Sequence, residues 1–507
     1  MKRDWSSRTA ILLVGLILIV INVIGLNIFQ RFDLTDDDVY SLSDASIDIV
    51  ENLDDPVTLT AFFTEGLPGP LSTNRRFLKD KLDDYRAYGG QNVQYRFVDP
   101  GDDEALREEA NKFRIPEQQI QVIESDAVQF KNVFMGLAIQ YGTEREVIPV
   151  IQDVSTLEYD ITGAIRRLTR ESLPSVGFLT GHGEPAPAQA LRTLYAQLDQ
   201  NYEAKSITVN DSLPILSDAP DALIIMAPTD SFPDHHLQAI DQYLMDGGRL
   251  AFLLNKVSAN LQSGQATPLS VGLDGILGSY GINIAQNLIM DTQSSAVTVQ
   301  QQQGFFTVNR QIEYPFFPIA SNFNNENLMV NRLSNMMFYF ASAIDTSSTL
   351  PSTVNYEPLI SSSENSQLQE GFFMIQPGIP GESFSGGPYT MAASYSGQFP
   401  SAFQTGTSSV DTRMIVVGDG DFLNESIVGP IPGNIEFGLN MVDWLVQDDA
   451  LLAIRAKKIE PRALNPTSEG ARPWIKYMNM LLPALIVVAF GLIRWRQRKS
   501  RQIILAQ

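Results

Sequence analysis

The sequence contains no cysteine among its 507 residues. This absence excludes disulfides, thiolate metal sites, a CxxC redox centre and a cysteine nucleophile. Positive charge is also scarce, because 36 lysines and arginines stand against 58 aspartates and glutamates and leave a net charge of −22. We expect no nucleic acid partner, since sequence-independent binding of phosphates depends on clustered positive charge.

Several motifs of catalysis are missing as well. No GxxxxGK[ST] occurs, so the chain is not expected to hold ATP in a P-loop, and the energy for any transport has to come from another polypeptide. The lack of a GxSxG elbow disfavours an α/β-hydrolase. His235 and His236 are adjacent and do not form the i, i+4 pair of a zinc helix, so they are expected to be solvated residues in a first helical turn.

Two long apolar runs lie near the ends of the chain. Residues 9–29 carry no charge, and residues 475–493 are apolar from Met478 onward; about 20 such residues are needed to cross a bilayer. A cleaved signal peptide is the alternative for the first run, which is long for that role and has no A-x-A exit. Basic residues at 2–8 and 494–501 predict two spans with both termini in the cytoplasm and an extracytoplasmic bulk.

Residues 32–172 are expected to alternate strands with helices in the order β-α-β-α-β-β-α, which is that of a thioredoxin-like domain. The last helix follows a Ser155-x-x-Glu158 capping box. Where an active thioredoxin carries its cysteines, this chain has TEGLPGP (residues 64–70), so the fold is expected without redox chemistry. That loop is either a partner-docking loop or a plain surface turn. Strands are predicted at Val57–Phe63, Asn92–Pro100, Phe134–Tyr141 and Glu146–Ile151.

The stretch VGFLTGHGEP (residues 176–185) organises the second half of the chain. An apolar strand ends in a glycine turn, and Pro185 suits the first turn of the following helix. Further strands at residues 222–230, 249–255 and 413–422 alternate with helices, which predicts a parallel, doubly wound sheet. Ligands of such sheets bind at the carboxyl ends of the strands, so His182 and Glu184 are expected to border any pocket.

Residues 292–410 differ in composition from the rest and show little helical periodicity. We interpret them as a β-rich insertion of short strands and long loops that covers the crevice as a lid or a partner-binding surface. Disorder is the alternative for residues 355–367 and 378–387. The segment LLAIRAKK (residues 451–458) is predicted to be an edge strand.

Seven residues are candidates for ligand or partner binding. His182 is a potential general base with Glu184 as its carboxylate partner; alternatively, His182 satisfies buried backbone groups at the strand end. The carboxylates of the set are potential ligands of an oxygen-rich metal site, although capping of the next helix is the competing role for Asp421. We expect no catalytic residue, no metal and no cofactor. The seven candidates are Gly181, His182, Gly183, Glu184, Asp230, Asp419 and Asp421.

Six motifs occur in a fixed order between the two apolar runs. They are FDLTDDDVYSLS, LEYDITGAIRRLTR followed by VGFLTGHGEP, DGGRLAFLLN, RMIVVGDGDF, and FGLNMVDWLVQDDALLAIRAKK. In this order the chain, from about residue 32 to residue 493, resembles the GldG-like family, the auxiliary component of ABC transport systems associated with gliding motility. The resemblance implies an inner-membrane subunit, sometimes called substrate-binding, that works with a separate ATPase and a separate permease. It also implies a second domain similar to class I glutamine amidotransferases or flavodoxins, without the catalytic cysteine.

The sequence therefore predicts an α/β protein with a thioredoxin-like domain (32–172) and a Rossmann-like domain (173–460) between spans at 9–29 and 475–493. Its expected role is that of a non-enzymatic auxiliary subunit of an ABC transport system in the bacterial inner membrane. Two alternatives remain open: a membrane-anchored cell-envelope hydrolase centred on GHGE, and an envelope scaffold with no ligand. The ligand and the direction of transport are not encoded in any recognisable motif.

Overall fold

The computed structural model describes residues 41–446 except 68, 125–126, 171, 210–215, 217, 304–305, 346–349 and 378–383, together with isolated residues nearer the two ends. Residues 1–458 form one compact unit and residues 459–507 a second. The predicted spans at 9–29 and 475–493 lie outside the described residues, apart from a few isolated positions. Among the residues that are described, no helix has both the length and the apolar character needed to cross a membrane.

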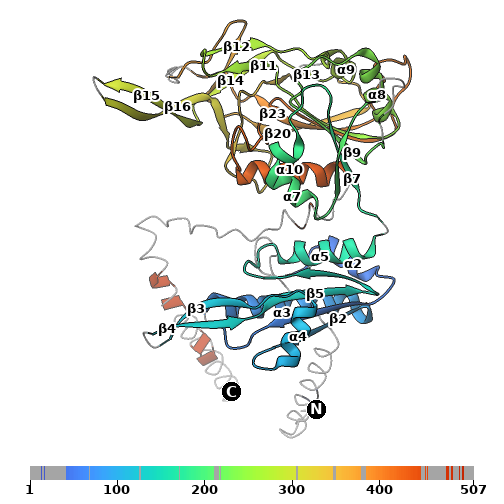
Figure 1. Cartoon of the computed structure of the whole chain (residues 1–507), viewed down its shortest axis with the longest axis vertical. Helices are drawn as coiled ribbons and strands as arrows, with labels where there is room; N and C mark the ends of the chain where they lie inside the picture. Colours follow the sequence, from blue (N-terminus) through green and yellow to red (C-terminus); the bar gives the residue numbers. More distant parts are fainter. Residues whose placement is uncertain are drawn as a thin grey trace, which may run out of the picture. The chain divides into compact units, whose positions relative to one another are not determined.

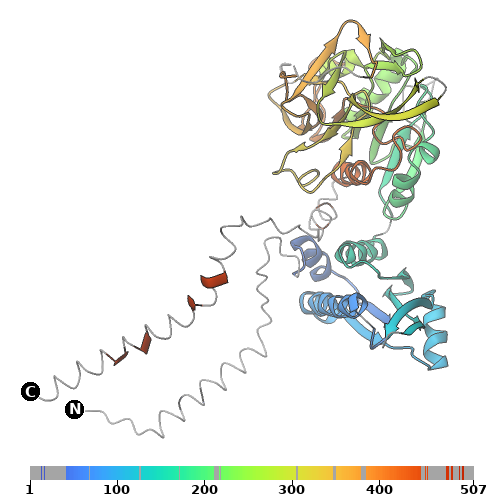
Figure 2. The same ribbon diagram turned by 90° about the vertical axis from the view of Figure 1, so that its left-hand side faces the viewer.

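The first domain is built on a four-stranded sheet with helices on both faces. Its elements are α2 (Asp44–Glu51), β1 (Val57–Phe63), α3 (Gly69–Gly89), η1 (Gly90–Asn92), β2 (Val93–Val98), α4 (Glu104–Lys112), β3 (Gln118–Glu124), β4 (Ala127–Val133), β5 (Met135–Tyr141), β6 (Glu144–Ile148) and α5 (Leu157–Thr169). The strand order is β2-β1-β5-β6, with β1 parallel to β2 and antiparallel to β5. Side chains of α2, α3 and α5 fill the core on one face, and α4 covers the other (Figure 2).

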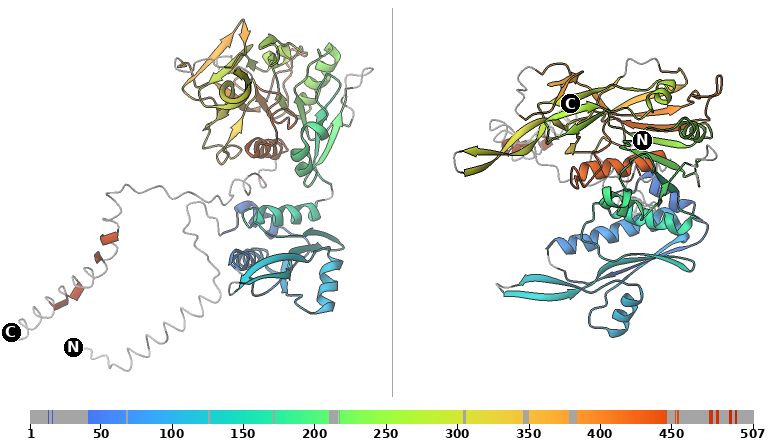
Figure 3. Two further views of the ribbon diagram at one scale, coloured as in Figure 1. Left: turned by 60° about the vertical axis from the view of Figure 1, so that its left-hand side comes forward. Right: turned by 45° about the horizontal axis from the view of Figure 1, so that its top comes forward.

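The predicted strands of this domain are confirmed, and one hairpin is added to them. Strands β3 and β4, which were not predicted from the sequence, pair with each other antiparallel. They form a separate two-stranded sheet that extends beyond the body of the domain (Figure 3). The observed order therefore has two more strands than the predicted order.

The predicted capping box at α5 is wrong. The helix follows Thr156, which makes no side-chain cap hydrogen bond, and the Ser155 hydroxyl donates to Asp153 instead. Glu158 turns inward, where its carboxylate lies 3.1 Å from the Lys81 ammonium. Glu158 therefore pairs with the buried Lys81 ammonium and does not cap the backbone N–H groups of the helix, as the local pattern predicted.

Glu158 is the centre of a buried polar network that joins three helices. Its Oε1 accepts hydrogen bonds from the Ser43 N–H (2.7 Å) and from the Ser46 hydroxyl (2.8 Å), which both belong to the start of α2. Lys81 of α3 also donates to the Ser41 carbonyl at 2.8 Å. The Tyr85 hydroxyl donates to the Glu158 carbonyl, and burial raises the pKa of this phenol well above its ordinary value.

The second domain contains an eight-stranded sheet and several small sheets. Its elements are β7 (Ser175–Leu179), α6 (Pro187–Ala190), α7 (Arg192–Leu198), β8 (Glu203–Ile207), β9 (Ala222–Met226), α8 (Asp234–Met245), β10 (Arg249–Leu253), β11 (Val257–Asn260), β12 (Gln265–Pro268), α9 (Asp274–Ser279), β13 (Asn283–Ile284), β14 (Asn287–Asp291), β15 (Ser294–Gln303), β16 (Phe306–Ala320), β17 (Asn322–Phe323), β18 (Met336–Met337), β19 (Ile344–Asp345), β20 (Val354–Ser361), β21 (Ser366–Glu370), β22 (Phe373–Met374), β23 (Thr390–Gly397), β24 (Thr412–Val417) and α10 (Pro432–Leu445).

The large sheet has the order β17-β20-β23-β24-β10-β9-β7-β8. The strands from β24 to β8 run parallel, whereas β23, β20 and β17 pair antiparallel at the other edge. The prediction of a wholly parallel sheet is therefore wrong at that edge. Helices α7 and α10 pack on one face of this sheet, and α8 and α9 pack on the other (Figure 1). The central strands are therefore buried on both faces. The α/β class is confirmed as a mixed α/β chain with several sheets.

The segment predicted as a β-rich insertion (292–410) supplies part of this sheet. Strands β17, β20 and β23 come from it, and residues 355–367, for which disorder was the alternative, form β20 and the start of β21. The same segment contains the long hairpin β15–β16, which projects from its domain (Figure 1). Leu452 and Ile454, the described residues of the predicted edge strand at 451–458, are helical, so that prediction is wrong at both positions.

Candidate functional site

The GHGE turn lies where β7 leaves the large sheet. Gly181 and Gly183 have φ angles of 121° and 78°, which favour glycine, so the chain reverses there as the sequence predicted. The following helix begins later than expected: Pro187, and not Pro185, occupies the first turn of α6. The carbonyl of His182 accepts the N–H groups of Thr229 and Asp230, both at 2.9 Å, and this ties the turn to the loop after β9.

His182 is the centre of a buried group of polar and aromatic side chains. Its Nδ1 lies 3.2 Å from Glu184 Oε1, and its Nε2 lies 2.7 Å from Nδ1 of His236 on α8. The ring stacks on Phe232 with 3.8 Å between centroids. The other Glu184 oxygen accepts the His182 N–H at 2.6 Å. Only 4% of the His182 side chain and 2% of the Glu184 side chain are exposed.

All three histidines of the chain therefore lie together, since His235 also contacts His236 with 4.2 Å between ring centroids. The prediction that His235 and His236 are simply solvated is wrong, because both are half-buried and His236 bonds to His182. The carboxylate of Glu184 orients one imidazole, which in turn bonds the second. This arrangement can hold or pass a proton, but the position that a hydrolase would give to a nucleophile is taken by an imidazole.

We expect Gly183→Ala to lower the unfolding free energy more than a glycine substitution that only strains the backbone. A Cβ at Gly183 would lie 2.0 Å from Thr229 Oγ1, in addition to the strain of a positive φ. The combined loss in unfolding free energy should be about 2–4 kcal/mol, measured by urea denaturation. The control is Gly66→Ala, which has φ 67° and no atom within 4 Å and should lose only about 1–2 kcal/mol. Equal losses in the two variants would contradict the close contact with Thr229.

The other predicted carboxylates lie on neighbouring loops of the same sheet edge. Asp230 follows β9 and lies beside Gly183, while Asp419 and Asp421 follow β24. Asp419 accepts the Tyr339 N–H at 2.5 Å and the Asp421 N–H at 2.7 Å. Burial, with the charge of Asp421 as a second cause, raises the pKa of Asp419 well above its ordinary value.

Asp421 does not cap the next helix, so that alternative is wrong. The helix α10 follows Ile431 without a side-chain cap, and Asp421 instead accepts the side-chain amide of Asn255 at 2.7 Å. The oxygen of the same Asn255 accepts the Gly420 N–H at 2.8 Å, which fixes the end of β10 to the end of β24. Burial raises the pKa of Asp421. Among the described residues, no three His, Asp or Glu side chains come together in a group that could hold a metal ion.

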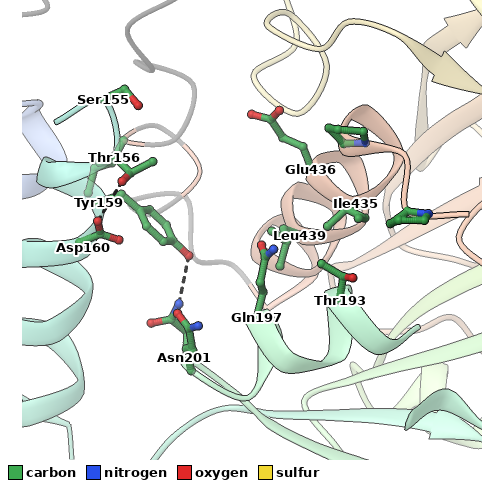
Figure 4. A pocket seen from close by; sticks show the side chains of 14 residues that line it. Ser155, Thr156, Tyr159, Asp160, Thr193, Gln197, Asn201, Ile435, Glu436 and Leu439 are labelled. Atoms are coloured by element: carbon green, nitrogen blue, oxygen red, sulfur yellow. Dashed lines mark hydrogen bonds between the residues drawn. The ribbon is translucent and has the colours of Figure 1, made fainter. Parts of the chain in front are cut away.

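A cavity of about 660 Å³ lies elsewhere, between α5 on one side and α7 and α10 on the other (Figure 4). His182 and Glu184 do not line it, so the prediction that they border the pocket fails for this cavity. Apolar groups of Tyr159, Ile435 and Leu439 face polar groups across it. Its lining residues are Ser155, Thr156, Tyr159, Asp160, Thr193, Gln197, Gln200, Asn201, Pro430, Pro432, Ile435, Glu436, Leu439 and Ile454.

Polar contacts fix the walls of this cavity. The side-chain amide of Asn201 donates to the Tyr159 hydroxyl at 3.0 Å, and Asn201 Oδ1 accepts from Arg167 at 2.5 Å. Asp160 accepts the Thr156 hydroxyl at 2.9 Å, and burial raises the pKa of this carboxyl. Beside the cavity, burial lowers the pKa of Arg166 to about 10. None of these residues was a candidate from sequence, because their proximity arises from elements distant in the chain.

The raised pKa of Asp160 predicts that the unfolding free energy depends on pH. The folded state binds this proton more tightly than the unfolded state, so the stabilisation is fully present below the ordinary aspartate pKa of about 3.9 and is lost as pH rises through the folded pKa. Asp160→Asn should remove that loss, because asparagine does not titrate. The loss of unfolding free energy is about 1.4 kcal/mol for each pKa unit by which the folded value exceeds the unfolded one. Urea denaturation from pH 3.5 to 7 should therefore show the variant gaining stability relative to the natural chain. The exposed Asp55→Asn is the control, and a gain that is independent of pH would contradict the assignment.

Comparison with known proteins decides the family. A family model described as an ABC-type uncharacterized transport system matches residues 173–441, which is more than half of the chain. The chain belongs to this ABC transport-system auxiliary family. A second model, a domain of unknown function, matches residues 36–140.

This auxiliary protein is similar to one protein and one solved structure that are both distant from it in sequence. An uncharacterized protein of Borreliella burgdorferi is 22% identical over 404 residues, which cover 76% of this chain and 78% of the relative. A solved structure titled mmIFT52 N-terminal domain has a TM-score of 0.34 and 13% identity, and the match covers 54% of this chain and 97% of that one. The family match includes the GHGE corner, the large sheet and most of α10. An association with ABC transporter components in general follows from membership.

Proposed function

We propose that this protein is the auxiliary, substrate-binding-like subunit of an ABC transport system of the gliding-motility type. A thioredoxin-like domain (32–172) and a Rossmann-like domain (173–460) would lie outside the inner membrane, between spans at 9–29 and 475–493 with both termini cytoplasmic. The protein would couple an extracytoplasmic ligand or partner to a separate permease and ATPase. The observation that carries the proposal is the family match over residues 173–441.

Three features support a non-enzymatic role in such a system. The sequence has no P-loop, so ATP hydrolysis falls to another subunit. The cavity between α5 and α10 is of a size that accommodates a small ligand or a peptide segment. At the GHGE corner both nitrogens of His182 are engaged, by Glu184 and by His236.

The partners are tested by purifying a tagged full-length chain from detergent-solubilised host membranes under native conditions. An ATPase with a P-loop and a permease with several spans should be recovered in comparable amounts. A tagged chain lacking residues 173–441 is the matched control and should lose both. Recovery of a folded, membrane-inserted chain without either subunit would refute the proposal.

The location is tested with single cysteines, because the natural chain has none and provides a clean background. Gln286→Cys places a thiol at an exposed position of the second domain, whereas Ser500→Cys places one in the basic tail. A membrane-impermeant maleimide added to intact spheroplasts should label the first and not the second. The opposite pattern would refute the proposed topology.

A cell-envelope hydrolase is the second candidate, and the bond between Glu184 and His182 is the observation in its favour. A carboxylate-oriented imidazole is the usual form of a general base. If the protein were such an enzyme, His182→Ala would abolish turnover of peptidoglycan fragments while the complex still assembled. We expect no turnover in the natural chain and therefore no loss.

A further inference from the structure

A smaller cavity, of about 340 Å³, lies on the antiparallel side of the large sheet. It is formed by β20, β23 and β24, and Trp444 at the end of α10 borders it. None of the seven candidate residues from the sequence takes part. Its lining residues are Asn355, Glu357, Ser394, Ser396, Gly397, Asp411, Thr412, Arg413 and Trp444.

The register of the strands places the polar side chains of this cavity in two rows. Asn355, Ser396 and Arg413 are direct neighbours across the three strands, and Glu357 lies opposite Ser394. Residues two apart share a face of a sheet, so both rows are on one face. The alternate residues Tyr356, Tyr395 and Met414 belong to the apolar core of the other face.

The same face is apolar farther along the strands. Ala392, Ile415 and Val417 pack there in the core beneath α10. Beyond Trp444 the sheet surface changes to serine, asparagine, glutamate and arginine. The row of Asn355, Ser396 and Arg413 lies at the ends of these strands, where Asn355 is exposed and the other two are half-buried.

Ser394 is the most buried polar residue of the two rows. The residue is only 3% exposed, and its hydroxyl makes no hydrogen bond with any residue that the structure describes. The hydroxyl is not among the buried side-chain atoms that lack a partner, so it is accessible from the cavity that Ser394 lines. A polar ligand in the cavity would supply the missing partner.

Charged groups of both signs line the cavity, and one of the carboxylates, Glu357, already accepts the side-chain amide of Asn324 at 2.9 Å. Two carboxylates, Glu357 and Asp411, stand against the single guanidinium of Arg413. That guanidinium already donates to the Trp444 carbonyl at 2.8 Å and lies 5.1 Å from the centre of the Trp444 ring. An anion would meet the two carboxylates, and a cation would meet Arg413. Hydroxyl groups of a neutral ligand can donate to the carboxylates and accept from the arginine, amide and serine donors.

We propose that this cavity binds a small, neutral, polyhydroxylated solute of the monosaccharide class. Its volume lies at the lower end of the range for small-molecule sites, which fits one sugar ring. Every side chain that lines the cavity carries a group able to form a hydrogen bond, and a sugar offers donors and acceptors over its whole surface. The inference rests on the geometry of one sheet face and does not depend on the proposed transport function.

The test is saturation-transfer-difference NMR and calorimetry on the full-length chain in a detergent without a sugar headgroup. The probes are D-glucose, D-galactose and N-acetyl-D-glucosamine, with the zwitterion glycine and the anion L-glutamate as competitors. At least one sugar should bind with a dissociation constant in the micromolar to millimolar range, and the amino acids should not. Glu357→Gln and Ser394→Ala should each weaken binding about tenfold, because the first removes a charged acceptor and the second a hydroxyl that would bond the ligand.

The matched control is Glu364→Gln, which removes an exposed carboxylate of the same domain outside the cavity and should leave sugar binding unchanged. Circular dichroism and thermal unfolding establish that each variant is folded. The proposal is overturned if no sugar binds the natural chain, if the amino acids bind in their place, or if sugar binding is equal in Glu357→Gln and the natural chain.

Discussion

Glu158→Ala should lower the unfolding free energy of the first domain by about 3–5 kcal/mol. The substitution leaves the Lys81 ammonium, whose side chain is only 4% exposed, without its carboxylate. It also removes the acceptor of the Ser43 N–H and the Ser46 hydroxyl, so the start of α2 loses its attachment to α5. Urea denaturation followed by circular dichroism measures the loss as an earlier transition of one domain.

An exposed ion pair of the same length provides the control for this prediction. Lys79 and Asp83 on α3 are 3.1 Å apart, as Lys81 and Glu158 are, but the Lys79 side chain is 52% exposed. Lys79→Ala should therefore change the unfolding free energy by no more than about 0.5 kcal/mol. The double variant Lys81→Met with Glu158→Leu should be more stable than Glu158→Ala, because no buried charge remains. A loss below 1 kcal/mol for Glu158→Ala would show that water reaches the network.

Asp443→Ala should destabilise the second domain by about 3–5 kcal/mol. Asp443 is fully buried on α10 and accepts the Tyr202 hydroxyl at 2.6 Å. It also opposes the effect of burial on Arg166 of α5, whose pKa is nevertheless lowered to about 10. Without Asp443 the buried Tyr202 hydroxyl loses its acceptor and the half-buried Arg166 guanidinium loses a nearby negative charge, and both contribute to the loss.

Two conservative variants separate the contributions at Asp443. Tyr202→Phe removes only the hydroxyl and should cost about 1 kcal/mol. Asp443→Asn keeps a hydrogen-bond acceptor but removes the charge, and its cost should lie between the other two. If Asp443→Asn and Asp443→Ala were equally destabilised, the negative charge toward Arg166 would explain the effect. If Asp443→Ala matched Tyr202→Phe, the charge would have no role.

Local patterns in the sequence predicted much of the fold. The strand and glycine turn of GHGE were recognisable because an apolar run ends at two residues that tolerate positive φ. The hairpin β3–β4 was not predicted although Ile120 and Val122 alternate with polar residues, since a few alternating apolar residues are a weak strand signal in a mostly polar segment. The antiparallel edge was missed because β23 pairs with β24, and no local pattern records which strand a segment joins.

The candidate site was predicted less completely than the fold. His182 and Glu184 are two residues apart, so their contact followed from the turn, whereas His236 lies 54 residues away from His182 and was missed. Asn255 was missed for the same reason, since its partner Asp421 is 166 residues distant. One signal did exist for Asp443: an aspartate within the apolar helix pattern NMVDWLV is costly unless it has a buried partner.

The pairing of β10 with β24 has a consequence for synthesis of the protein. These central neighbours are separated by about 160 residues of chain, all of which must leave the ribosome before the sheet can close. At about 5–20 residues per second, the apolar edge of β10 waits for roughly 8–30 seconds without its partner. Nascent chains of this protein therefore expose an aggregation-prone strand for much longer than a domain of nearest-neighbour hairpins would, and a chaperone that holds unfolded chains should raise the yield of soluble second domain.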